Sequence, residues 1–224
     1  MFDNEKSKFS ESWSLPPEQI EARSFEIIAK LLPEVSHTDH SWPVISRIVH
    51  ATGDPSIASL VRIHPEAIEA GVNALRAGCP IVADVGMVAA GISRRLADNL
   101  GCRLICAIDS PGVAEMARKE GITRSAAAVR ALSSILQGAV VAIGNAPTAL
   151  FALLDAIDGR QPVPALIVGT PVGFVGAAES KGELVRRCES GPPYITVAGT
   201  RGGSAVAAAA VNALLRLAAG KDGL

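Results

Sequence analysis

Four histidines could move protons near neutral pH, and His50 has the most informative surroundings. It follows an apolar helical pattern over Pro43 to Val49 and precedes Ala51-Thr52-Gly53-Asp54-Pro55, a sequence that ends helices. The helix dipole stabilises a protonated histidine at a helix C-terminus, which suits that side chain to proton donation. An ordinary capping histidine fits the same residues, and the pattern alone favours that simpler interpretation.

The other histidines give weaker indications. His37 and His40 flank Asp39 in a polar stretch, but a metal site there needs a further ligand from elsewhere. A solvated connection is therefore the favoured interpretation. His64 precedes Pro65 and is explained by the start of a helix. No metal site is predicted.

Gly-containing loops follow three strand-like runs, at 140–148, 167–176 and 197–204. In each loop, small or polar residues, such as Asn145 in the first, lead into a helix. Such turns expose backbone N–H groups at the positive end of a helix, where anions bind. None matches the dinucleotide or P-loop fingerprint, so carboxylates are favoured over nucleotide phosphates.

Two charged residues beside predicted elements are further candidates. Arg124 follows Thr123, a predicted helix cap, and could bind a carboxylate through two hydrogen bonds. The alternative is an exposed arginine on a solvated helix face, which composition favours. Asp84 lies within an apolar run that is predicted to be a strand. It is a candidate for a buried acid; the alternative is that it only accepts hydrogen bonds from nearby backbone groups.

The elements that must position these residues alternate from about residue 80 onward. Apolar runs typical of strands covered on both faces alternate with helical patterns, which predicts an α/β, three-layer fold. Its mainly parallel five-stranded sheet has helices on both faces, and an N-terminal helical segment precedes it. The predicted strands are 81–85, 103–108, 139–143, 165–168 and 194–197. The predicted helices are 17–32, 42–51, 65–76, 111–120, 124–137, 147–157 and 202–219.

Composition limits the classes of function. The 224 residues have a formal net charge of −1, which gives no general attraction for nucleic acid or an anionic membrane. No signal peptide or membrane-spanning run is evident, so a cytoplasmic protein is expected. The four cysteines lack Cys-x-x-Cys spacing and are predicted to be free thiols. Residues 1–15 form a polar, poorly ordered tail in this interpretation, and residues 16–224 form a single domain.

Long blocks of the chain resemble the precorrin-8x methylmutase family, which includes the cobalt-precorrin-8 methylmutases. The resemblance runs from about residue 17 to 216 in the family's order. Its blocks are Arg23 to Ile28, Ser46 to Ala51, Gly121 to Ala128, Gly138 to Leu153, Pro171 to Lys181 and Arg201 to Leu214. Runs of eleven or more matching residues are far more specific than a single Gly-rich motif.

The resemblance implies an α/β homodimer that acts on a corrinoid substrate without a cofactor. The family moves a methyl group from carbon 11 to carbon 12 of a late corrin precursor, giving hydrogenobyrinate, or cobyrinate in the cobalt-early route. It implies that His50 donates and accepts a proton, that Ser24 and Arg47 contact substrate, and that Arg124 binds a carboxylate. Asn145 lies in a matching block and is predicted to bind substrate.

One block departs from the family. Where the family usually has Gly-Val/Ile-Thr-Arg-Ala-Arg-Leu, this chain has Gly91-Ile92-Ser93-Arg94-Arg95-Leu96. Ser93 keeps the hydroxyl and loses a methyl group, so a substrate contact there is a weaker expectation. Two other functions stay open at this point: a non-catalytic tetrapyrrole-binding carrier on the same scaffold, and an enzyme acting on a different polyanion.

Overall fold

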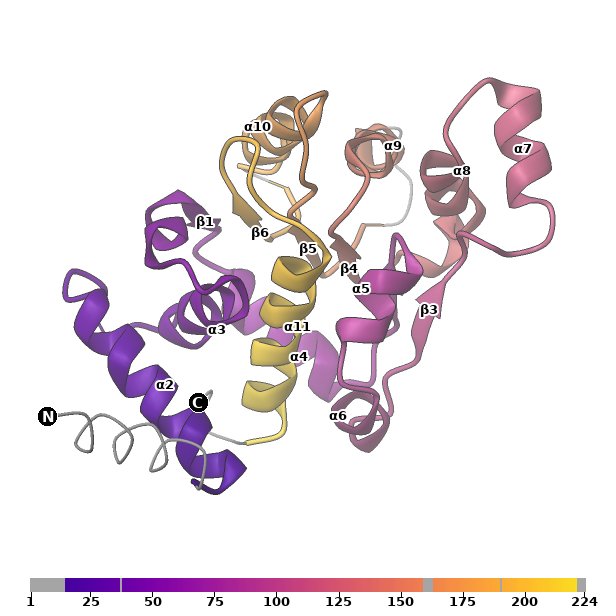
Figure 1. Cartoon of the computed structure of the whole chain (residues 1–224). Coiled ribbons are helices and arrows are strands. Elements are labelled where there is room, and N and C mark those ends of the chain that lie inside the picture. Colours follow the sequence, from indigo (N-terminus) through magenta and orange to yellow (C-terminus); the bar gives the residue numbers. More distant parts are fainter. Residues whose placement is uncertain (1–14, 37, 159–162, 190, 221–224) are drawn as a thin grey trace, which may run out of the picture.

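The computed structural model describes residues 15–36, 38–158, 163–189 and 191–220. Six strands form one sheet (Figure 1): β1 (Val61–Ile63), β2 (Ile81–Ala83), β3 (Leu104–Cys106), β4 (Val140–Ile143), β5 (Leu166–Gly169) and β6 (Tyr194–Val197). Their order across the sheet is β1-β6-β5-β4-β2-β3. The five predicted strands are all present and mutually parallel. The predicted tail lies outside the described residues, except for Leu15.

The sixth strand, β1, corrects the prediction of a five-stranded sheet. It pairs antiparallel with β6 at one edge, with Val61 opposite Val197 and Ile63 opposite Ile195. A run of only three residues, Val-Arg-Ile, is too short to show whether its apolar residues follow the period of a strand or that of a helix. Pairing with β6, which only the folded chain provides, makes them a strand.

Ten α-helices and two 3-10 helices accompany the sheet in the described residues. They are α2 (Pro17–Leu31), α3 (Trp42–Thr52), η1 (Pro55–Leu60), α4 (Ala67–Arg76), α5 (Gly86–Gly91), α6 (Arg94–Asn99), α7 (Val113–Glu120), α8 (Arg124–Ala131), η2 (Ser133–Ile135), α9 (Pro147–Asp158), α10 (Ala177–Arg187) and α11 (Ser204–Ala218). The helix predicted over 124–137 is shorter: α8 ends at Ala131, and a 3-10 turn over Ser133–Ile135 follows it.

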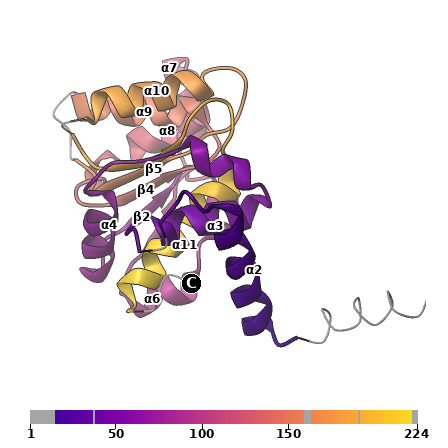
Figure 2. The ribbon, with the colours of Figure 1, turned by 90° about the vertical axis from the view of Figure 1, so that its left-hand side faces the viewer.

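The helices cover both faces of the sheet, as predicted. Figure 2 shows α7 to α10 on one face, and α3, α4, α6 and α11 on the other. Alternate strand residues enter two separate apolar cores: Ala142 and Val168 face α11, whereas Val141 and Ile167 face the α8–α9 side. This alternation follows from the period of two of a strand buried on both faces.

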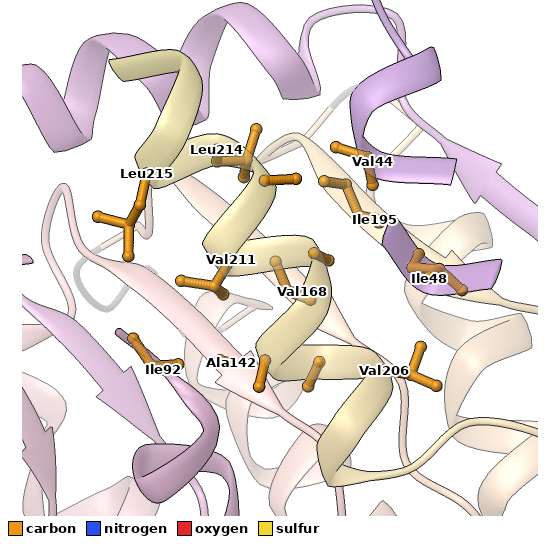
Figure 3. Close-up of a cluster of buried hydrophobic side chains, with 14 of the residues drawn as sticks. Val44, Ile48, Ile92, Ala142, Val168, Ile195, Val206, Val211, Leu214 and Leu215 are labelled. Atoms are coloured by element: carbon orange, nitrogen blue, oxygen red, sulfur yellow. The ribbon is translucent and has the colours of Figure 1, made fainter. Parts of the chain in front are cut away.

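Helix α11 is the centre of the larger core (Figure 3). Val206, Val211 and Leu214 are buried in one core; Val206 lies on the side of α11 that faces Ile48 of α3, and Val211 on the side that faces Ile92. The alanines of α11 let other backbones approach: a Cβ added at Gly91 would lie 2.8 Å from Ala208 Cβ. The buried alanines of α11 therefore pack against other parts of the same chain.

Candidate active site

His50 lies in the last turn of α3 with its side chain exposed. Gly53 ends the helix in the left-handed conformation, and its N–H donates to the Val49 carbonyl at 2.9 Å. A side chain with a Cβ rarely adopts this conformation, so Gly53 fixes where the helix stops. The His50 ring lies against Phe25 of α2, with ring centroids 5.2 Å apart. The imidazole is therefore held on one side and open to solvent on the other.

Arg47 lies one helical turn before His50 and is buried. Its two terminal nitrogens each donate to Glu21 Oε1 at 3.1 Å, and its guanidinium lies 4.9 Å from the centre of the Phe25 ring. Arg216 of α11 also donates to Glu21, at 3.2 Å. Burial, followed by the charge of Arg216, lowers the pKa of Arg47, and Glu21 opposes both effects. Two arginines therefore share one carboxylate beside His50.

Ser24 is on α2 in the turn that carries Glu21 and Phe25, and it is half-buried. Its hydroxyl donates to the carbonyl of Ile20 at 2.8 Å, which leaves the oxygen able to accept another hydrogen bond. Helix α2 thus brings Glu21, Ser24 and Phe25 to the side of α3 that carries Arg47 and His50. Only His50, Ser24 and Arg47 of this set were predicted.

Asn145 is exposed at the start of the β4–α9 loop, but the loop's N–H groups are already used. Asp84, which is 3% exposed, accepts from the N–H of Gly144 at 3.1 Å, and from those of Asn145 and Ala146 at 3.0 Å. Burial raises the pKa of Asp84, and these hydrogen bonds oppose that rise. Both expectations for Asp84 are confirmed, because the side chain is buried and accepts hydrogen bonds from neighbouring backbone groups. This loop binds an anion, and the anion is the protein's own side chain.

Ser93 caps α6, and its hydroxyl accepts from the N–H of Leu96 at 3.4 Å. Its own N–H donates to the Asn212 side chain at 2.8 Å, and Asn212 donates to the Gly91 carbonyl at 2.8 Å. The half-buried hydroxyl therefore has a structural partner, and its proton is available to a further acceptor.

Arg124 is the first residue of α8 and its side chain is 58% exposed. It contacts the exposed carboxylate of Asp109 at 3.4 Å. Thr123 caps the helix as predicted, and its hydroxyl meets that of Thr148 at 2.7 Å, which joins α8 to the first turn of α9. Helices α8 and α3 lie over different parts of the sheet (Figure 1), so Arg124 and His50 occupy separate places in one chain.

The loops that follow β5 and β6 are joined to each other and to the end of α3. Lys181 of α10, 1% exposed, donates from Nζ to the Arg201 carbonyl at 2.5 Å. Arg201 in turn donates to Asp54 and, at 2.9 Å, to Ser56. Asp54 lies one turn beyond His50. Desolvation lowers the pKa of Lys181 to about 8.

Two backbone hydrogen bonds complete this junction. Gly203 N–H donates to the Thr170 carbonyl at 2.8 Å, and Gly173 N–H donates to the Thr200 carbonyl at 3.1 Å. A Cβ added at Gly202 would lie 2.3 Å from the Thr170 carbonyl oxygen, so only glycine allows the two loops to cross here. We refer to the set of residues 170–173, 181 and 200–203, with Asp54, as the loop junction.

A large cavity lies elsewhere in the described part of the chain. It has a volume of about 1160 Å³ and is lined by the start of α3, β1, α4 and the end of α11, with His40 and His64 among its walls. None of the predicted site residues lines it. In the part of the chain that the structure describes, no three His, Cys, Asp or Glu side chains are grouped to hold a metal ion, and His37 lies outside that part. We therefore assign the site from side-chain chemistry and not from cavity size.

Comparison with known proteins identifies the family. The family model for precorrin-8X methylmutase matches residues 19–217. The chain belongs to this family. A precorrin-8X methylmutase of Pseudomonas aeruginosa is 49% identical over 168 residues, which cover 75% of this chain and 80% of that protein. A cobalt-precorrin-8 methylmutase of Priestia megaterium is 39% identical over 205 residues, which cover 92% and 90%.

Solved structures agree with this membership in the methylmutase family. The precorrin-8x methylmutase of Thermus thermophilus superposes with a TM-score of 0.79 at 37% sequence identity, covering 90% of this chain and 98% of that one. A precorrin-8X methylmutase related protein superposes with a TM-score of 0.75 at 35% identity. The methylmutase fold therefore extends over nearly the whole chain.

Glu21, Phe25, Lys181 and Asp54, which lie beside the candidate residues or in the loop junction, were not predicted from the sequence. A signal was present for Lys181: Ala177, Lys181 and Leu184 have the i, i+4, i+7 spacing of a buried helix face. The pairing of Glu21 with both Arg47 and Arg216 joins residues distant in sequence, so no local pattern reports it.

Proposed function

We propose that this chain catalyses methyl migration from carbon 11 to carbon 12 of precorrin-8x or cobalt-precorrin-8, giving hydrogenobyrinate or cobyrinate in cobalamin biosynthesis. One observation carries the proposal: the exposed imidazole of His50 lies beside Phe25 and one turn from Arg47, in a methylmutase-family chain. An accessible imidazole next to an arginine and an aromatic ring suits a reaction on an acidic macrocycle.

The chemistry asks little of the protein beyond position and one proton. The bond from the methyl group to carbon 11 breaks, the bond to carbon 12 forms, and the product has the same atoms as the substrate. A proton that His50 gives to the ring during migration must be returned, so one imidazole acts as both donor and acceptor. Holding the ring so that this nitrogen faces the reacting carbons supplies the rest.

The five substrate-binding residues of the proposal offer different contacts. Arg124 is exposed and its contact with Asp109 is long, so it can exchange that partner for a substrate carboxylate. Arg47 is held by Glu21 and supplies a fixed positive charge. Ser24, Ser93 and the Asn145 amide supply hydrogen bonds around the ring. Any cobalt would enter as part of the substrate. The homodimer and the cytoplasmic location belong to the same proposal.

Turnover tests the proposal directly. Purified protein is mixed with precorrin-8x, and separately with its cobalt form, and the absorbance of the corrin product is followed. We expect native turnover with at least one ring form and a loss of about 100-fold or more in kcat for His50→Ala, as for a removed general acid. His40→Ala is the matched control, because His40 is also an exposed histidine but lines the 1160 Å³ cavity away from the candidate site. Binding of product without native turnover would instead support the carrier.

A further inference from the structure

Large apolar side chains are fully exposed in the loop between β5 and α10. Phe174 is 93% exposed and Val175 is 90% exposed, and Val172 in the same loop is 47% exposed. Met87, in the first turn of α5, is 73% exposed. The loops that carry Phe174 and Met87 both follow parallel strands, so both lie at the carboxyl edge of the sheet.

The exposure comes from a backbone that is held in place. The Gly173 N–H is bound to the Thr200 carbonyl, and Gly176 has the left-handed conformation that begins α10. A Cβ added at Gly176 would lie 3.4 Å from Pro147, so the loop also packs on the start of α9. The chain thus presents two adjacent apolar side chains outward from a fixed support.

The same support connects this loop to the proposed proton donor. Thr200 accepts from Gly173, the adjacent Arg201 binds Asp54, and Asp54 lies four residues after His50. On the other side, the loop packs against Pro147 and Phe151 in the first turns of α9, which begins two residues after Asn145. Hydrogen bonds therefore join the loop that carries the apolar pair to the segment that follows His50.

We propose that Phe174 and Val175 form the apolar wall on which one face of the substrate macrocycle rests. This inference rests on the proposed function. A corrin precursor has a broad, methyl-bearing face and carboxylates at its edge, so it needs apolar contact at the centre and cations around it. The loop supplies the apolar contact, and Arg47, one helical turn from His50, supplies a cation. Exposed aromatic surface of this kind marks a binding site in a soluble protein.

The test compares Phe174→Ala/Val175→Ala with native protein in turnover and in titration with the corrin product. We expect KM and the product Kd each to rise tenfold or more, with a smaller change in kcat, because the wall positions the ring without touching the proton. Val163→Ala truncates an exposed apolar side chain at the opposite end of β5 and should leave both constants unchanged. Because both truncated positions are exposed, the double variant is expected to fold normally.

Two results would refute the proposed contact between the macrocycle and Phe174 and Val175. Unchanged KM and Kd in the double variant, with active native protein, would show that the macrocycle does not contact these side chains. A change of association state in sedimentation velocity would show that they are covered by a second copy of the chain. Inactive native protein would contradict the proposed function itself, which keeps the two failures distinguishable.

Discussion

The buried lysine of the loop junction predicts an unusual dependence of stability on pH. Desolvation lowers the pKa of Lys181 from 10.5 to about 8. Between these two values the unfolded chain keeps the lysine proton and the folded chain releases it. Stability rises with pH wherever the unfolded state binds more protons, so this residue makes the folded protein more stable as pH rises from 8 to 10.5.

The size of the effect follows from the two pKa values. At about 1.4 kcal/mol per pKa unit, the difference corresponds to roughly 3 kcal/mol. Below pH 8 both states are protonated, and the folded state carries the whole cost of burying the ammonium group. Above pH 10.5 both are neutral and the cost is gone. The 2.5 Å hydrogen bond to the Arg201 carbonyl exists in either state of the amine.

Urea unfolding of native protein and of Lys181→Met at pH 7, 8, 9, 10 and 10.5 measures this effect. The native free energy of unfolding minus that of the variant should rise by roughly 2–3 kcal/mol between pH 8 and 10.5. Buried thiols act in the opposite direction, since burial raises the pKa of Cys79 and Cys188 to about 11, but both proteins contain them. Subtraction therefore removes their contribution.

Lys30→Met, at an exposed position of α2, controls for the general effect of removing one lysine. A difference between native protein and Lys181→Met that stays constant within about 0.5 kcal/mol over this range would refute the reasoning. It would mean that Lys181 keeps its proton in the folded protein as easily as in the unfolded chain.

The remaining predictions concern two internal carboxylates. Asp84→Asn replaces one acceptor oxygen by an NH2 donor that faces backbone N–H groups. It should lower the free energy of unfolding, measured with urea, by about 2–4 kcal/mol. The control, Asp98→Asn at an exposed position, should change it little. Glu21→Gln leaves Arg47 and Arg216 close together without a neutralising charge. This variant should lower the free energy of unfolding by about 1–3 kcal/mol and raise KM. The control, Glu18→Gln, should do neither. Equal stability of Glu21→Gln and native protein would contradict the shared-carboxylate arrangement.

Much of the fold could be read from local patterns. The five parallel strands are continuous apolar runs, and the end of α3 is marked by Gly53, so both were predicted at nearly the right residues. The strand β1 was missed because its three residues become a strand only by pairing with β6. A partner distant in sequence cannot be recognised from a short run alone.

The site was less predictable than the fold. The residues Ser24, Arg47 and His50 came from family resemblance, and in the structure α2, which carries Ser24, packs on Arg47 and His50 of α3 through Glu21 and Phe25. The interactions that hold them, from Glu21 and Phe25, depend on how two helices pack. The loop after β4 shows the same limit: its N–H groups suggested an anion site, and only the folded chain shows that Asp84 occupies them.

The carboxylate of Asp84 has a consequence for selectivity. Free backbone N–H groups at the start of a helix bind small oxyanions such as phosphate and the phosphates of nucleotides. Because Asp84, directly after the neighbouring strand β2, already accepts from the N–H groups of residues 144–146, these groups are not available to an anion from outside. The exposed polar group of this loop is the neutral side-chain amide of Asn145. Such an amide selects a ligand by its shape and by the direction of its hydrogen bonds, and not by its charge.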